Sequence, residues 1–181
     1  MNEDIKIFLI CGKARTGKNT VGSILKEKLE LSGNKVCEIQ LMRTVKGYLK
    51  DYFGWDGADN TKPRTMLQQM GTELIKEKMN MPLFHINRLT DDIKVLSNYF
   101  DTFIVDDIRL KNEINEIKNR FNNVTVILVE KTNYDSDLTD IQKSHVTEND
   151  LNDYNEYDYK IVNDDLDELA KQVNNTIGVG N

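Results

Sequence analysis

Short apolar runs alternate with helical stripes along almost the whole chain. Five runs rich in β-branched or aromatic residues are typical of buried strands, and they span 5–11, 36–41, 102–106, 124–129 and 159–162. Apolar residues also recur at helical spacing in five segments, at 21–29, 67–74, 83–96, 110–117 and 166–177. Strands that alternate with helices predict parallel β–α–β units. We therefore predict an α/β fold in which helices flank a central parallel five-stranded sheet.

Two polar segments lack a clear pattern. Residues 43–59 are polar with several aromatic side chains, and residues 131–155 form a long polar stretch with no strong strand. Loops as long as 131–155 are often lids in compact domains. Ligands of parallel sheets bind beyond the carboxyl ends of the strands. That rule places 12–20, 41–59 and 106–109 at one edge of the predicted sheet.

The bulk properties indicate one soluble globular domain. The 181 residues suit a single core, so we predict one domain over 1–181, and 39% hydrophobic with 30% charged residues is ordinary for such a domain. A formal charge of −6 argues against nucleic-acid and anionic-membrane partners. No apolar run reaches transmembrane length, and the acidic start at 1–4 is unlike a signal peptide. Cys11 and Cys37 are expected to be free thiols in a reducing cytoplasm.

The most specific chemical signal follows the first strand. Four residues separate Gly12 from Gly17 and Lys18 follows directly, which is the G-x-x-x-x-G-K spacing of a phosphate-binding P-loop. Glycines allow a tight loop whose backbone N–H groups face phosphate oxygens, and the lysine adds a mobile positive charge. The next helix turns its N-terminus toward the same anion. The predicted nucleotide-binding residues are Gly12, Lys13, Ala14, Arg15, Thr16, Gly17, Lys18, Asn19 and Thr20.

Four segments in order resemble the bacteriophage-type deoxynucleoside monophosphate kinases, a family of the P-loop kinase superfamily. They are the loop at 12–20, the basic helix start at 62–73, the strand end at 104–113 and the Ser-His-Val-Thr-Glu segment at 144–148, and they span nearly the whole chain. The resemblance implies a three-layer P-loop kinase fold with a helical acceptor-binding region at about 42–100 and a lid at about 131–155. It also implies ATP and Mg²⁺ as the cofactors.

The resemblance suggests how metal and phosphate would be held. Asn19 stands where Ser or Thr commonly ligates Mg²⁺, so Thr20 and Asp107 are the predicted metal residues, with water completing the shell. Strand alternation sends Asp106 and Asp107 in opposite directions, and the resemblance selects Asp107. The alternative for Asp107 is a cap of the following helix. The predicted catalytic residues are Arg15, Lys18, Asp107 and Arg109.

Further basic and amide residues are candidates for the acceptor site and the lid. The predicted acceptor residues are Arg43, Lys46, Arg64, Gln68 and Gln69, and the predicted lid residues are Lys131, Lys143 and His145. Arg64 and Gln68 share one helical face and could grip a monophosphate and the edge of a base. Each of them could equally belong to a solvated amphipathic helix. Aromatic side chains at 52, 53 and 55 could stack on a base or belong to the core.

We therefore predict ATP-dependent phosphoryl transfer to a nucleoside or deoxynucleoside monophosphate. The partners would be small-molecule nucleotides, and a homodimer is left open. Lys76 and Lys131 stand where the family more often has arginine, which weakens the assignment of the acceptor because lysine lacks the bidentate fork. One alternative is kinase activity on a phosphomevalonate-like metabolite, whose enzymes share a similar loop. The other is a nucleotide-binding regulator or slow ATPase.

Overall fold

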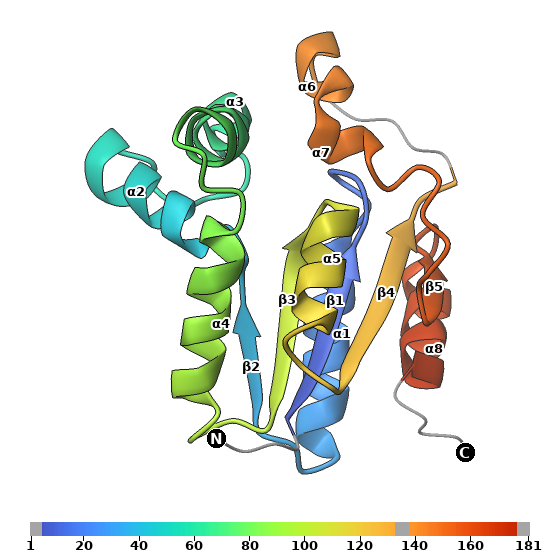
Figure 1. Cartoon of the computed structure of the whole chain (residues 1–181). Helices are drawn as coiled ribbons and strands as arrows, with labels where there is room; N and C mark the ends of the chain where they lie inside the picture. Colours follow the sequence, from blue (N-terminus) through green and yellow to red (C-terminus); the bar gives the residue numbers. More distant parts are fainter. Residues whose placement is uncertain (1–4, 133–137, 177–181) are drawn as a thin grey trace.

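A five-stranded parallel sheet forms the centre of the molecule (Figure 1). The computed structural model describes residues 5–132 and 138–176, and its strands run in the order β2-β3-β1-β4-β5. All four neighbouring pairs are parallel. The strands are β1 (Lys6–Cys11), β2 (Val36–Ile39), β3 (Thr102–Ile108), β4 (Val124–Glu130) and β5 (Tyr159–Val162). The predicted parallel five-stranded α/β fold is confirmed.

Helices cover both faces of the sheet, because successive strand residues point to opposite sides. In β1, Ile7 and Leu9 belong to one apolar cluster, whereas Phe8 and Ile10 belong to the other. The first cluster is closed by α4 (Phe84–Leu96) and α5 (Lys111–Lys118), and the second by α1 (Lys18–Leu31) and α8 (Leu166–Thr176). The result is a three-layer arrangement with two buried interfaces.

A second group of helices stands over the carboxyl ends of the strands (Figure 1). It comprises α2 (Arg43–Phe53), α3 (Arg64–Gln68), the π-helix η1 (Gln69–Lys78), α6 (Asp140–Ser144) and α7 (Val146–Asn149). The predicted helix start within 62–73 is observed as α3, which begins after the N-cap residue Pro63 and continues into η1 without a break. A π-helix of this length is rare, and such segments are frequent at functional sites.

The two segments without a sequence pattern contain helices after all. The first holds α2, whose buried residues are Val45 and Leu49; this spacing of four residues was hidden among polar and aromatic neighbours. The predicted lid is described at 131–132 and 138–155, and it contains α6 and α7. Thr139 begins α6 with a capping box to Gln142. These helices are short and mostly exposed, so they carry almost no apolar stripe.

Two further expectations concern the whole molecule. Among the residues described, no helix is both long and apolar enough to cross a membrane. Cys11 and Cys37 are both free, as predicted, and Cys11 is buried while Cys37 is half-buried. Burial raises the pKa of the Cys11 thiol to about 12. Cys11 therefore behaves as a small core residue rather than as a nucleophile.

Candidate active site

The glycine loop lies between β1 and α1, at the carboxyl edge of the sheet. Gly12 has φ +140° and Gly17 has φ +90°, a region of backbone conformation that side chains rarely adopt. A Cβ at Gly12 would overlap the carbonyl oxygen of Val129, and a Cβ at Gly17 would overlap the amide of Asn163. Both glycines are therefore required by backbone conformation and by space.

Lys18 is buried inside the loop that it follows. Its ammonium donates to the carbonyl oxygen of Gly12 at 3.0 Å and to that of Lys13 at 2.6 Å. Burial lowers the pKa of Lys18 well below its ordinary value, and the positive charge of Arg109 lowers it further. A cation that is poorly compensated in this way gains from an added anion. The loop is thus electrostatically prepared for phosphate.

Two side chains from other elements hold the loop in place. Asn163, directly after β5, donates through Nδ2 to the carbonyl oxygen of Thr16 at 2.9 Å. Glu148 of α7 accepts from the backbone N–H of Ala14 at 2.8 Å. Arg15, at φ +63°, extends from the loop toward Asp59 with 3.7 Å between its Nη1 and the carboxylate. The loop is therefore fixed from both sides and carries a cation at its tip.

Asp107, at the end of β3, braces the turn that precedes α2. It accepts from the backbone N–H groups of Leu41 (2.7 Å) and Met42 (3.2 Å) and from the ammonium of Lys46 (2.9 Å). Burial acts to raise the pKa of Asp107, but Lys46 and the two N–H groups outweigh it and lower the pKa. The carboxylate therefore stays ionised and does not cap α5, which was the alternative for this residue. The cap of α5 is supplied by Glu113.

Asp106 faces the other side, toward α1. It accepts from Gln40 Nε2 at 3.1 Å, and a Cβ placed on Gly22 of α1 would lie 3.8 Å from the Asp106 Cβ. Burial, followed by the charge of Asp107, raises the pKa of Asp106. Asp106, Asp107 and Thr20 line the same cavity next to the loop. Sequence reasoning selected Asp107 for this cavity and assigned no role to Asp106.

Two cavities meet beside the loop. The first contains Lys18, Asn19 and Thr20, and the second extends along α3 and η1. We name them the donor cavity and the acceptor cavity after the predicted roles of these residues. The residues that line both are Lys46, Lys62, Arg64, Asp107 and Arg109. Burial, then the charge of Lys46, lowers the pKa of Lys62. The shared wall is therefore rich in cations, and Lys46, Lys62 and Arg109 each have one carboxylate partner there, Asp107, Asp59 and Glu148.

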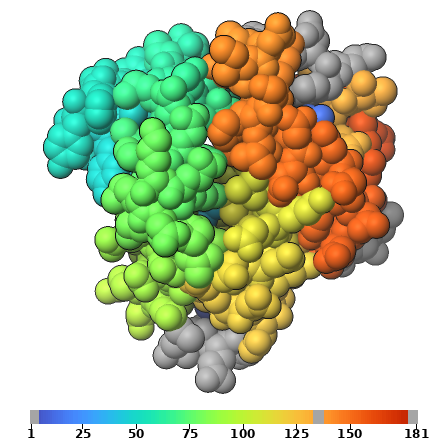
Figure 2. All heavy atoms as spheres, turned by 45° about the horizontal axis from the view of Figure 1, so that its top comes forward, coloured from blue at the N-terminus to red at the C-terminus, as the bar shows by residue number. Residues whose placement is uncertain are grey.

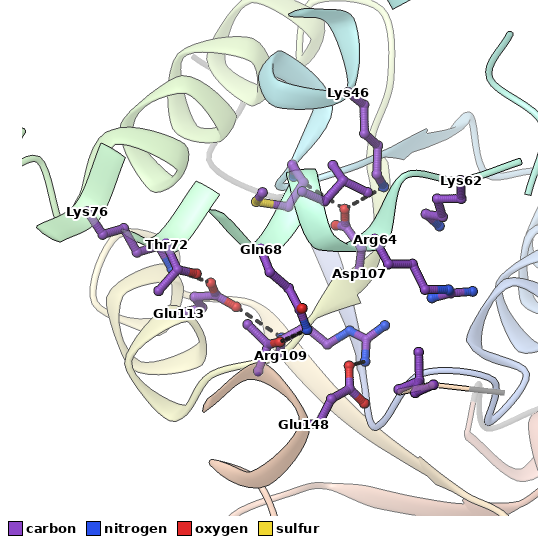
Figure 3. Close-up of a pocket in the computed structure, with 14 residues that line it drawn as sticks. Lys46, Lys62, Arg64, Gln68, Thr72, Lys76, Asp107, Arg109, Glu113 and Glu148 are labelled. Atoms are coloured by element: carbon purple, nitrogen blue, oxygen red, sulfur yellow. Dashed lines mark hydrogen bonds and ion pairs between the residues drawn. The ribbon is translucent and has the colours of Figure 1, made fainter. Parts of the chain in front are cut away.

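The far end of the acceptor cavity has a different character (Figure 3). Lys76 of η1 and Glu113 of α5 form an ion pair of 2.8 Å beside Thr72, and both side chains are nearly buried. Glu113 also accepts from the backbone N–H groups of Arg109 and Leu110. Gln68 lies between this end and the cationic wall. The far end is therefore polar and close to neutral, with hydroxyl, amide and ammonium donors.

The lid helices α6 and α7 lie against α3 of the acceptor cavity (Figure 2). Gln142 of α6 donates to the hydroxyl of Thr65 at 3.0 Å, and Gln68 of α3 donates to the Thr147 hydroxyl of α7 at 3.5 Å. Thr147 and Glu148 also line the acceptor cavity. The lid segment thus forms one wall of that cavity.

The structure does not bring all the predicted acceptor and lid residues to these cavities. Arg43 lies outside both because its guanidinium is tied to Asp92 of α4 at 2.6 Å. Gln69 is exposed, since it follows Gln68 on the helix and faces away from the cavity. Lys143 is exposed on α6, and His145 caps α7 by accepting from the Thr147 N–H. Lys131 lines a separate hollow beside the loop with Gly12, Lys13 and Thr16.

The aromatic residues after the second strand do not stack in the acceptor cavity. Tyr52 and Phe53 are 76% and 57% exposed on α2, and Trp55 lies under the Lys50 ammonium at 5.5 Å from the ring centroid. Sequence reasoning missed Lys62, Glu113 and Glu148, which do line the cavity. The signal for Lys62 was available, because it lies two residues before Arg64, at the start of the same basic segment. No periodic signal marks Glu148.

Comparisons with known proteins support the assignment of the fold. The APS kinase of Mycobacterium tuberculosis, solved with AMPPNP and APS, matches with a TM-score of 0.55 at 13% identity, over 96% of each chain. A sugar kinase from Janibacter, solved without ligand, matches with a TM-score of 0.52 at 9% identity, over 97% of this chain and 96% of that one. The chain has the fold of the P-loop kinases. No family model matches the sequence, and no characterised protein was matched by sequence.

Proposed function

We propose that this protein transfers the γ-phosphoryl group of ATP to a monophosphate, and that the acceptor is a nucleoside monophosphate. The observation that carries this proposal is the shared wall of the two cavities, where Lys46, Lys62, Arg64 and Arg109 face both. A nucleotide on the loop and a monophosphate in the acceptor cavity would direct their phosphates at this wall. Phosphoryl transfer requires such concentrated positive charge and little covalent chemistry from the protein.

On the donor side, the loop amides and Lys18 would bind the nucleotide phosphates. The Lys18 ammonium donates to two loop carbonyls, and a phosphate oxygen would replace these contacts with stronger, charge-assisted ones. Arg15 at the loop tip and Arg109, directly after β3, would add positive charge as the γ-phosphoryl group leaves. An oxygen of the acceptor phosphate would attack the γ-phosphorus of ATP directly and ADP would leave, so no covalent intermediate on the protein is needed.

The residues beside the loop fit a magnesium ion. Asp106, Asp107 and the Thr20 hydroxyl supply oxygen atoms around one cavity, and oxygen donors with retained water are what Mg²⁺ prefers. The bound ion would neutralise charge on the β- and γ-phosphates. We assign Asp106 as the main water-mediated partner because Asp107 already braces the turn before α2 and Lys46. Thr20 would complete this side.

The far end of the acceptor cavity favours a base over an anionic head. Glu113 offsets the charge of Lys76, so a second negative group there would gain little. The hydroxyl of Thr72 and the amide of Gln68 can donate to or accept from the edge of a base. A phosphomevalonate-like acceptor would place its carboxylate beside Lys76, where Glu113 already supplies a negative charge, so this end of the cavity favours it less. The expected setting remains the cytoplasm.

A coupled assay of ADP release from Mg·ATP tests this proposal. The panel contains the common deoxynucleoside and ribonucleoside monophosphates and phosphomevalonate. We expect stimulation by at least one nucleotide. Stimulation by phosphomevalonate alone would favour the isoprenoid acceptor, and ADP release without stimulation by any acceptor would favour a slow ATPase or regulator.

A further inference from the structure

The Glu148 side chain lies between the donor loop and the acceptor cavity. Its Oε2 accepts from the backbone N–H of Ala14 at 2.8 Å, and its Oε1 accepts from Arg109 Nη1 at 3.0 Å. The side chain is only 9% exposed. Figure 3 shows Glu148 directly against the Arg109 guanidinium. One buried carboxylate therefore contacts both regions: one oxygen binds the donor loop, and the other binds Arg109 of the acceptor cavity.

The charge of Glu148 matters because Arg109 stands among like charges. Arg109 shares its wall with Lys46, Lys62 and Arg64. The positive charge of Arg109 helps to lower the pKa of Lys18, and the negative charge of Glu148 opposes that effect. Without a carboxylate at this point, the guanidinium would be repelled toward solvent. Glu148 can therefore hold Arg109 at the wall while leaving its other N–H donors for phosphate.

Glu148 also belongs to the lid segment. Its neighbour Thr147 meets Gln68 of α3, and His145 caps the same short helix. The position of the carboxylate therefore depends on how α7 lies against the acceptor helix. If a bound acceptor shifted Gln68, the shift would be transmitted through Thr147 and Glu148 to the guanidinium of Arg109.

We propose that Glu148 is a positioning residue that aligns Arg109 and the donor loop for phosphoryl transfer. This inference rests on the proposed function, but its structural half can be tested without turnover. Glu148 would not touch the reacting atoms. It acts by fixing the guanidinium and the Ala14 N–H, so that both substrates meet in one geometry. A small misplacement of such groups is enough to lower the rate by about 100-fold.

The first test is ¹⁵N NMR of the arginine side chains in the full chain without ligand. The Arg109 guanidinium signal is assigned with Arg109→Lys and compared between wild type, Glu148→Gln and the control Glu116→Gln. Glu116 is a suitable control because it pairs with Arg120, which follows the same helix, 3.6 Å away. We expect the Arg109 signal to be protected from exchange in wild type and Glu116→Gln and averaged in Glu148→Gln. An Arg109 signal unchanged by Glu148→Gln would overturn the proposal.

The second test is steady-state kinetics with the best acceptor. Glu148→Gln should lower kcat by about 10- to 100-fold while the KM for ATP changes by less than about threefold. In the Arg109→Lys background, the same substitution should cost no more than about threefold, because the two residues act together. The proposal would be contradicted if the two substitutions lowered kcat independently, so that their factors multiplied, or if Glu148→Gln kept the wild-type kcat. Glu148→Asp, which keeps the charge but is too short to span both partners, replaces Glu148→Gln if that variant unfolds. If wild type phosphorylates no acceptor, the proposed function fails while the NMR comparison still decides the role of Glu148.

Discussion

The two phosphate sites that we propose, the donor loop and the acceptor cavity, are built in different ways. The loop is one continuous stretch of nine residues, 12–20, and its conformation is imposed by two glycines and a lysine buried against its own carbonyls. The acceptor cavity is assembled from α2, α3, η1, β3, α5 and α7, and none of these elements forms it alone. A local motif can therefore be recognised in a sequence, whereas an assembled cavity depends on how distant segments meet.

The two regions also compensate charge differently. The ammonium of Lys18 contacts carbonyl oxygens of the loop, and burial, followed by the charge of Arg109, lowers its pKa, so Lys18 would gain from an incoming anion. In the acceptor region, Lys46 and Lys76 are each paired with a buried carboxylate, Asp107 and Glu113. A single substitution in the donor loop should therefore abolish most of the activity. A single substitution on the acceptor side should mainly weaken acceptor binding.

Replacement of Lys18 should have the largest effect and should affect the donor side. Lys18→Ala removes the charge nearest the transferred group, and we expect kcat to fall by about 1000-fold. The fold should persist, since removing a cation whose pKa is already depressed leaves no unpaired buried charge. Lys26→Ala, a surface lysine paired with Glu38, is the control. Circular dichroism and the transfer rate check both points, and near-wild-type activity of Lys18→Ala would show that the donor site is elsewhere.

Replacement of Arg64, which lines both cavities, should affect the acceptor side more than the donor side. Loss of one charge-assisted contact with phosphate is worth about 1.5–3 kcal/mol, so Arg64→Ala should raise the acceptor KM by roughly 10- to 100-fold. ATP affinity, measured by calorimetry, should change little. Arg43→Ala is the matched control, because Arg43 is held by Asp92 outside the cavity. If Arg43→Ala raised the acceptor KM more than Arg64→Ala, the acceptor site would be misplaced.

Acid should weaken the acceptor region through His85. The His85 Nε2 bonds the carbonyl of Gly71 in η1 at 3.0 Å, and within the described residues its buried Nδ1 has no partner. Burial lowers the pKa of His85, partly offset by that hydrogen bond. Below pH 6.5 the unfolded chain takes up a proton that the folded chain resists, so stability falls as the pH drops from there.

Urea unfolding of wild type and His85→Gln at pH 7 and pH 5 measures this effect. We expect His85→Gln to be less stable at pH 7 by about 1–3 kcal/mol, because a buried polar contact is disturbed. The variant should also lose less stability than wild type between pH 7 and pH 5. Equal losses would show that His85 does not titrate across this range.

The smallest effect is expected at the exposed aromatic residues of α2. Tyr52→Ala should change stability by less than about 0.5 kcal/mol, as surface substitutions usually do. The acceptor KM should stay within about twofold, because Tyr52 is 76% exposed and does not line the acceptor cavity. Acceptor titrations of the variant check this, and a large rise in KM would restore the stacking hypothesis.

Much of the fold could be predicted because its core elements carry strong apolar patterns. The fifth strand was placed at its observed bounds, and the helix after the loop was placed within three residues of its bounds. Helix α2 was missed because its inward positions, Val45 and Leu49, lie among polar and aromatic residues. The change from α3 to the π-helix was also invisible, since a shift of hydrogen-bond partner leaves the apolar face almost unchanged.

The candidate site could be predicted on the donor side and only in part on the acceptor side. The loop residues follow from one local spacing. Lys46, Arg64 and Gln68 were predicted for the acceptor site and do line the cavity, whereas Arg43 is diverted by Asp92, 49 positions away. Glu148 is 134 positions from Ala14. A contact of that separation depends on how the lid folds back, which no local pattern specifies.

Identification of the products by ³¹P NMR tests the central claim most directly, because ADP release alone would also result from ATP hydrolysis. The protein is incubated with Mg·ATP and the nucleoside monophosphate that stimulates ADP release most. We predict a new nucleoside diphosphate signal that grows in equal amount with ADP, and its loss in Lys18→Ala. Inorganic phosphate in equal amount with ADP, with no new diphosphate, would contradict the account.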